Sequence, residues 1–260
     1  MKMHDTRLLL EEMTTRDVAE RIGGGWRTVL VPLGATEQHG PALPLLVDAA
    51  HGRETCLRAA RRLGRALVGP VVSLGHSPQH ASFAGTVSIS PATLAGIIHD
   101  IAESHARSGF RLVYFWIAHA ESNATLQATL PWLRDRWPGC RVDGLRSLAD
   151  YAAATWDVMG PREGVTPEVA GSHAGELEAS MLLAIHPKLA RMDRAEAGNP
   201  APFGTLVERM MREGMASVSA NGVLGDQRAG DAARGDRYLD RLAEYAAAEV
   251  AGIREEIGLE

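Results

Sequence analysis

The chain has 260 residues, of which 45% are apolar and 23% are charged, and its net charge is −5 at pH 7. This composition is ordinary for a globular protein, and the length is sufficient for a sizeable core. A negative net charge gives no reason to expect a nucleic acid or an anionic membrane as partner, because both require basic surfaces. The two cysteines, Cys56 and Cys140, are far apart in sequence, so neither a disulfide framework nor a CxxC metal motif is expected.

The N-terminal segment 1–13 holds a short apolar run that is interrupted by Glu11 and Glu12. Such a run is too short and too acidic for a secretory signal, and no apolar run of about 18 residues occurs elsewhere. We therefore expect a cytoplasmic protein.

Apolar runs and helical periodicity alternate along the chain. Helices are predicted at 7–22, 49–63, 90–108, 124–137, 171–186, 206–220 and 236–257, and strands at 29–31, 66–74, 111–117 and 141–145. Segment 150–170, rich in Gly and Pro, is predicted to be a long loop over one end of the sheet, and 193–204 a second loop. Helix-length connections between strands indicate an α/β fold with a mostly parallel sheet, and residues 1–260 are interpreted as one domain.

The segment after the first predicted strand carries the first chemical signal. Glu37 and His39 are two residues apart, so extended backbone projects both side chains from the same face, and Asp48 follows nine residues later. A carboxylate, an imidazole and a second carboxylate at the end of a strand are suitable ligands for a divalent metal.

A mirror of this pattern, His119-x-Glu121, follows the third predicted strand. Asp48 could then bridge two metals, because its carboxylate has two oxygens. Two divalent ions bring four positive charges, which Glu37, Asp48 and Glu121 with a bridging hydroxide would balance. Mixed imidazole and carboxylate ligands favour Zn²⁺, Mn²⁺ or Fe²⁺.

Structural interpretations compete with these assignments. Asp48 could instead cap a helix, His173 could be a loop histidine, and Glu176 and Glu178 could serve the helix dipole. His76 and His80 are ambiguous between the site and the surface. The remaining histidines fall in predicted helices or at the terminus and are interpreted as structural: His4, His51, His99, His105 and His186.

Several segments together resemble the creatininase (creatinine amidohydrolase) family, which also includes the mycofactocin-precursor peptidase and formamide deformylases. The resemblance extends from about Leu8 to the C-terminal helix. It is carried by 32–41 (PLGATEQHGP), 43–44 (LP), Asp48, 83–86 (FAGT), His119-x-Glu121, 173–180 (HAGELEAS) and 222–226 (GVLGD).

The resemblance implies a three-layer α/β/α fold, commonly a homohexamer, and hydrolysis of an amide or similar C–N bond at a two-metal site. Carried over to this chain, one metal would be held by Glu37, Asp48 and His119, and the other by His39, Asp48 and Glu121. His173 matches the histidine that transfers a proton to the leaving nitrogen, and Glu178 matches the carboxylate that supports it.

Three residues near the expected pocket depart from the family pattern: Ala42, where a histidine is usual, Ala118, where a glycine is usual, and Ser122, where creatininase has asparagine. They put creatinine itself in doubt as the substrate. Around the substrate we place Ser122, Trp156, Glu176 and His80, and a surface or core role is the alternative for Trp156.

The sequence thus predicts a two-metal hydrolase that cleaves a C–N bond of a small, cyclic amide through attack of a metal-held hydroxide. The expected cofactors are two divalent ions (Zn, Mn or Fe), and the expected partners are a small molecule and further copies of the chain. Alternatives are a lactone or cyclic polyol ketone as substrate, a peptidase of the mycofactocin-precursor type, or a non-enzymatic metal-dependent subunit.

Overall fold

A four-stranded parallel sheet forms the centre of the computed structural model, which describes residues 7–259. In the order β2-β1-β3-β4, the strands are Ala66–Val68, Thr28–Leu33, Leu112–Ile117 and Arg141–Gly144. Every residue of β1 and β3 is buried, which explains why their apolar runs do not alternate. β2 is shorter than predicted because Pro70 cannot donate to a strand ladder, and beyond it Val72 forms only a single bridge, to Leu33.

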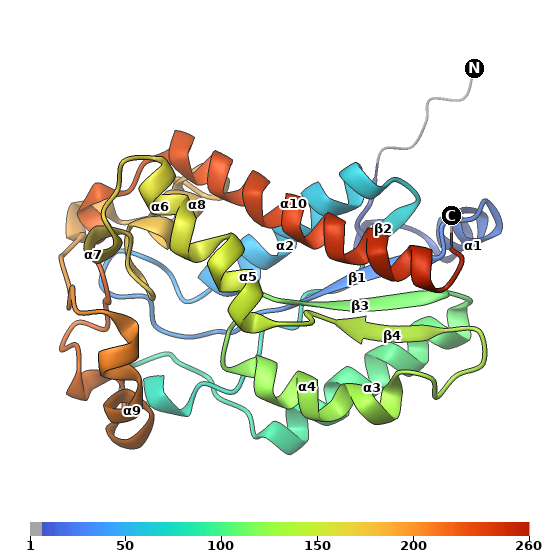
Figure 1. Ribbon diagram of the computed structural model, residues 1–260, viewed down its shortest axis with the longest axis horizontal. Helices are drawn as coiled ribbons and strands as arrows, with labels where there is room; N and C mark the ends of the chain where they lie inside the picture. Colours follow the sequence, from blue (N-terminus) through green and yellow to red (C-terminus); the bar gives the residue numbers. More distant parts are fainter. Residues whose placement is uncertain (1–6, 260) are drawn as a thin grey trace.

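Helices cover both faces of the sheet, as predicted (Figure 1). α2 (Val47–Leu63), α8 (Glu176–Ile185) and α10 (Ala232–Glu256) pack together on one face, and α3 (Pro91–Ser108) and α4 (Ser122–Leu133) pack together on the other. The predicted ends of α3 are confirmed. The Ser90 side chain accepts a hydrogen bond from the Thr93 N–H, and Gly109 ends the helix in the left-handed conformation.

The first helix, α1 (Thr15–Gly23), begins later than predicted. Thr14 and Asp17 form a reciprocal capping box that fixes its start. The preceding residues instead run along the sheet, where Leu9 bridges Val68, before a 3₁₀ turn at Leu10–Glu12. The apolar side chains of that segment therefore serve the sheet and not a helix.

The prediction of a long loop at 150–170 is wrong. This segment consists of three short helices, α5 (Leu148–Ala154), α6 (Trp156–Arg162) and α7 (Pro167–Ala170). Helices of one or two turns are too short to show a clear period of 3.6 residues. α9 (Phe203–Glu213) starts inside the second predicted loop, and further 3₁₀ turns occur at Pro78–His80, Met192–Arg194, Met215–Ser217 and Gln227–Ala229. Within residues 7–259, no helix combines the length and apolar character needed to cross a membrane.

Gly34 allows the end of β1 to touch the first turn of α2. A Cβ atom at this position would lie 2.7 Å from the backbone N of Ala49 and 2.8 Å from its Cα. We expect Gly34→Ala to lower the free energy of unfolding by about 1–3 kcal/mol, because backbone atoms must move to relieve the clash. Urea denaturation measures the change.

The matched control for this prediction is Gly96→Ala in α3, where an added Cβ meets no atom within 4 Å. This substitution should raise the free energy of unfolding by about 0.5–1 kcal/mol, because alanine loses less backbone entropy in a helix. A Gly34→Ala protein as stable as the wild type would contradict the close packing of β1 on α2.

His105 of α3 makes the folded state sensitive to acid. Its ring packs edge-on against Phe110, with 5.4 Å between ring centroids, and burial lowers its pKa to about 4. The unfolded chain binds a proton at His105 near pH 6.5 and the folded chain only near pH 4, so stability decreases as the pH falls through this window. Relative to His105→Gln, the wild type should lose about 2–3 kcal/mol of unfolding free energy between pH 7.5 and pH 4.5. Parallel losses in the two proteins, measured by urea denaturation at both pH values, would disprove this.

Candidate metal centre

The candidate site lies at the carboxyl ends of β1 and β3. Leu33 of β1 pairs with Ile117 of β3, so the two strands end at the same level. The chain continues from β1 to Glu37 and His39, and from β3 to His119, whose N–H donates to the Leu33 carbonyl at 3.2 Å. β2 pairs on the other side of β1, so the strand order reverses here, and crevices at such points are the usual ligand sites of open parallel sheets.

The first group of side chains contains the three residues predicted for one metal. Nδ1 of His119 lies 3.5 Å from Oε2 of Glu37 and 3.6 Å from Oδ2 of Asp48, and all three side chains are buried. Asp48 lies inside the first turn of α2, whose N-cap residue is Leu46. The alternative that Asp48 is the helix cap is therefore wrong.

The second group has a different composition from the predicted one. Nε2 of His39 lies 3.3 Å from Oδ1 of Asp48 and 3.5 Å from Oε1 of Glu178, in the first turn of α8. Glu178 thus lies where the sequence analysis expected Glu121. Asp48 directs one oxygen to each group, as expected for a shared ligand.

Glu121 lies beside His119 instead, with Oε2 3.4 Å from its Nδ1. The prediction assumed extended backbone after β3. Glu121 has helical backbone angles (φ −65°, ψ −25°) and precedes the first residue of α4, so its side chain does not project in parallel with that of His119.

Three histidines are each anchored through one ring nitrogen and turn the other toward the carboxylates. Nδ1 of His39 donates to the Glu37 carbonyl at 3.1 Å, Nε2 of His119 to the His76 carbonyl at 3.2 Å, and Nε2 of His173 to the Gln38 carbonyl at 2.9 Å. In each of these pairs the ring nitrogen donates, because a carbonyl oxygen only accepts. The side-chain amide of Gln38, 3.0 Å from Nε2 of His173, has other acceptors in Nδ1 of His80 and the Gly222 carbonyl. Anchoring of this kind is typical of metal-binding histidines.

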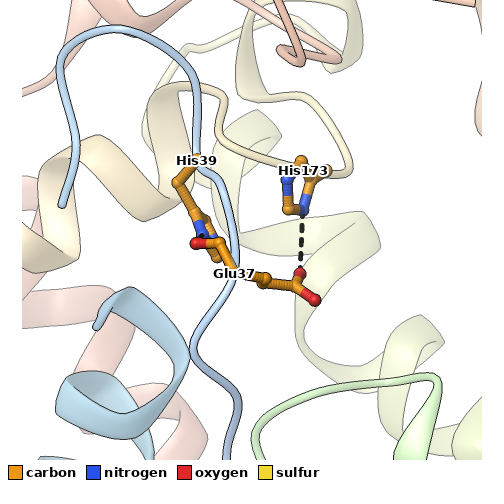
Figure 2. Close-up of side chains that lie close together, drawn as sticks. All are labelled: Glu37, His39 and His173. Atoms are coloured by element: carbon orange, nitrogen blue, oxygen red, sulfur yellow. Dashed lines mark hydrogen bonds and ion pairs between the residues drawn. The ribbon is translucent and has the colours of Figure 1, made fainter. Parts of the chain in front are cut away.

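His173 joins the cluster from the loop that precedes α8 (Figure 2). Its Nδ1 lies 3.8 Å from Oε1 of Glu37, and its ring lies between those of His39 and His80, with 4.5 Å between centroids on each side. Burial, followed by the nearby His39, lowers the pKa of His173, which favours its neutral form.

The electrostatics of the cluster favour added positive charge. Burial raises the pKa of Glu37 to about 8. Burial alone would lower the pKa of His119, but the carboxylates of Glu37 and Glu121 raise it to about 9. Both shifts favour the protonated forms, so the buried carboxylates favour positive charge beside them.

The donor atoms fit a divalent cation. Within the described residues, Oε2 of Glu37, Nε2 of His39 and Oδ2 of Asp48 are buried without a hydrogen-bond partner. Ligand atoms bound about 2.0–2.2 Å from one tetrahedral ion lie roughly 3.3–3.6 Å apart. The four histidine–carboxylate contacts within the two groups span 3.3–3.6 Å, which is the spacing expected around such an ion.

His51 was interpreted as structural, yet Nε2 of its buried ring lies 3.7 Å from Oδ1 of Asp48. The spacing of Asp48 and His51 in a helix places both on one face, which is a signal that the sequence contained. His4, also interpreted as structural, lies outside the described residues.

Of the four side chains placed around the substrate, Trp156 lines a cavity of about 300 Å³ that opens onto the cluster. His80 is buried, with Nε2 3.5 Å from Oε1 of Glu37, and Ser122 is buried in the first turn of α4. Glu176 pairs with Arg234 of α10 at 2.8 Å, away from the cavity. Positions 176 and 178 project from opposite sides of a helix, so only one of the two glutamates can face the site.

Comparison with known proteins supports the similarity seen in the sequence. The sequence model of the creatininase family, described as creatinine amidohydrolase, matches residues 11–250. The chain is 33% identical to the mycofactocin precursor peptide peptidase of Mycobacterium ulcerans over 251 residues, covering 94% of this chain and 92% of that protein. It is 32% identical to the creatinine amidohydrolase of Pseudomonas putida over 205 residues, covering 74% of this chain and 77% of that protein.

A solved structure, titled "Creatininase Mn", superposes with a TM-score of 0.76 at 26% identity and covers 96% of this chain and 99% of that one. This agreement extends over the parallel sheet and both helical layers. The chain belongs to the creatininase family, whose members are hydrolases.

Proposed function

We propose that this protein is a metal-dependent hydrolase that cleaves a C–N bond of an amide. The observation that carries the proposal is the arrangement of His39, His119 and His173, each of which is anchored to a carbonyl and directs its free nitrogen toward buried carboxylates. A purely structural cluster has no need for three such anchored rings around unpartnered acceptor atoms.

Two divalent cations would be held by the two groups of side chains. Glu37, Asp48 and His119 suit one ion, and His39, Asp48 and Glu178 suit the other, with Asp48 shared. When bound, such ions lower the pKa of a coordinated water and polarise a carbonyl oxygen. The chemistry of imidazole with carboxylate favours Zn²⁺, Mn²⁺ or Fe²⁺.

His173 is suited to move the proton. Its ring lines the cavity, and Nδ1, the nitrogen that does not donate to Gln38, can accept a proton from the attacking water. Hydrolysis forms a bond from the water oxygen to the carbonyl carbon and breaks the C–N bond, and the proton then passes from Nδ1 to the leaving nitrogen. Glu178 would also help to position His173, because its Oε2 accepts a hydrogen bond from the N–H of the next residue, Ala174.

The substrate is a small amide, either cyclic or part of a peptide. The names of the similar proteins support both forms, because one relative is a creatinine amidohydrolase and another is a peptide peptidase. The match to the peptidase covers more of the chain, which favours a peptide as the second candidate. We also expect a cytoplasmic homo-oligomer.

Metal analysis and chelation test the proposal. We expect up to two divalent transition-metal ions per chain, loss of amide hydrolysis after exhaustive chelation and dialysis, and recovery with Zn²⁺ or Mn²⁺. The assay panel holds creatinine, other cyclic amides and short peptides. Ion binding should also raise the melting temperature, because the folded state alone contains the cluster. Full hydrolytic activity in ion-free protein would refute the proposal.

A further inference from the structure

A second cavity, which we name the side chamber, adjoins the cavity of the metal centre. It has a volume of about 230 Å³, compared with about 300 Å³ for the site cavity. Both cavities are lined by Trp156, Asp157, Gly171, Ser172 and Phe203, which therefore form a common partition. The two spaces are compartments of one cleft, and only one of them contains the cluster.

The side chamber is mainly apolar and is held in shape by the backbone. Its lining includes Pro161, Pro167, Ala170, Pro200, Ala201 and Pro202. The segment that carries the last three is fixed by Asn199, whose N–H donates to the Val223 carbonyl at 2.9 Å and whose side-chain amide donates to the Val218 carbonyl at 2.8 Å. Such a chamber is formed before a ligand arrives.

The partition is also fixed. The indole N–H of Trp156 donates to the Tyr151 hydroxyl at 2.8 Å, which sets the orientation of the ring between the two spaces. Phe203, at the start of α9, is 42% exposed and provides apolar surface at the rim.

The charges of the cleft exclude one class of ligand. Neither cavity is lined by a lysine or arginine among the described residues, whereas Asp157 and Glu168 line the side chamber. Asp157 forms no ion pair with another described residue. A carboxylate or phosphate in the side chamber would meet these acids without a compensating cation, so an anionic group is disfavoured. The mainly apolar lining favours an uncharged group over a cationic one.

From these observations we propose that the side chamber is a specificity subsite, which takes an uncharged apolar group of the substrate about the size of a phenyl or isobutyl side chain. This rests on the proposed function, because it places the scissile amide in the adjoining site cavity. The substrate class is then an amide that carries a residue-sized apolar substituent, as a peptide does, and not an isolated small ring.

Hydroxamates test the proposal, because their two oxygens chelate divalent ions and the attached groups can be varied. Calorimetry would measure their affinities for Zn²⁺-loaded protein. Acetohydroxamate is the minimal probe. 3-Phenylpropionohydroxamate adds an aromatic group on the acyl side, and N-benzylacetohydroxamate adds one on the nitrogen side. A para-carboxylate derivative of 3-phenylpropionohydroxamate adds a negative charge to the aromatic group.

We expect at least one of the two aromatic probes to bind about 10-fold to 100-fold more tightly than acetohydroxamate, as burial of a phenyl group predicts. Whichever probe gains affinity shows whether the acyl side or the nitrogen side of the amide faces the chamber. If the acyl-side probe gains affinity, its para-carboxylate derivative should lose that gain. No gain for either aromatic probe would overturn the subsite in the wild-type protein, without reference to any variant.

Ala201→Phe should fill the chamber and reduce the aromatic gain to about threefold or less, while acetohydroxamate binds as in the wild type. Ala197→Phe is the matched control, because Ala197 is exposed on the same loop and lines neither cavity. A gain that survives Ala201→Phe would place the apolar group elsewhere and overturn the assignment. If acetohydroxamate itself fails to bind, the proposed metal centre is refuted and the subsite with it.

Discussion

Asp48→Asn is expected to remove both ions and to reduce kcat/KM for amide hydrolysis by about a thousandfold or more. Oδ1 of Asp48 faces His39, at 3.3 Å, and Oδ2 faces His119, at 3.6 Å. Asparagine would keep the shape of the side chain but would remove its charge and one of its two oxygens. The amide NH₂ that replaces this oxygen would face one of the two groups and cannot bind a cation. Metal analysis and hydrolysis assays on the purified variant measure both effects.

Asp135→Asn serves as the control, because the Asp135 side chain is 83% exposed and lies outside the cluster. It should keep wild-type metal content and activity. Circular dichroism would establish that the Asp48→Asn chain is folded. A folded Asp48→Asn protein that retains two ions per chain would disprove the shared role of this carboxylate.

Glu178→Gln and Glu121→Gln should differ sharply in metal content. Glu178 completes the group around His39, so its substitution should leave about one ion per chain and reduce kcat/KM by about a hundredfold or more. Glu121 contacts His119 from the entrance of α4, so its substitution should retain two ions and reduce kcat/KM by about tenfold to a hundredfold.

The two substitutions are matched in chemistry, since each replaces a glutamate by its isosteric amide close to a histidine of the cluster. A difference in metal content between the two variants therefore reports the position of the glutamate and not the chemical change. Loss of one ion in Glu121→Gln with two ions retained in Glu178→Gln would restore the ligand set that the sequence alone suggested.

The parts of the fold that local signals determine were predicted from the sequence. Ser90 and Gly109 mark both ends of α3, and the unbroken apolar runs of β1 and β3 identify strands buried on both faces. Capping and burial in these elements depend on neighbouring residues, so a linear pattern contains the necessary information.

The wrong predictions concern segments whose structure is determined by contacts between residues far apart in sequence. Leu9 looks helical in its local pattern, but it pairs with Val68 of β2. At the site, the sequence analysis named Glu37, His39, Asp48 and His119 correctly as neighbours, because each follows a strand or begins the next helix.

The position of Glu178 beside His39 depends on how α8 packs against α2, which no local spacing encodes. Glu121 was placed by assuming an extended backbone, and the early start of α4 removes that assumption.

Asp48 and Glu178 lie in the first turns of α2 and α8, so the positive ends of two helix dipoles are directed at the cluster. Each contributes roughly half a positive charge, which stabilises the ionised carboxylates. The same partial charges would repel a cation bound by the proposed centre, so we expect its affinity to be lower than the ligands alone would give. Ions held in this way are expected to exchange with the surrounding solution, so the identity of the bound metal would follow its supply.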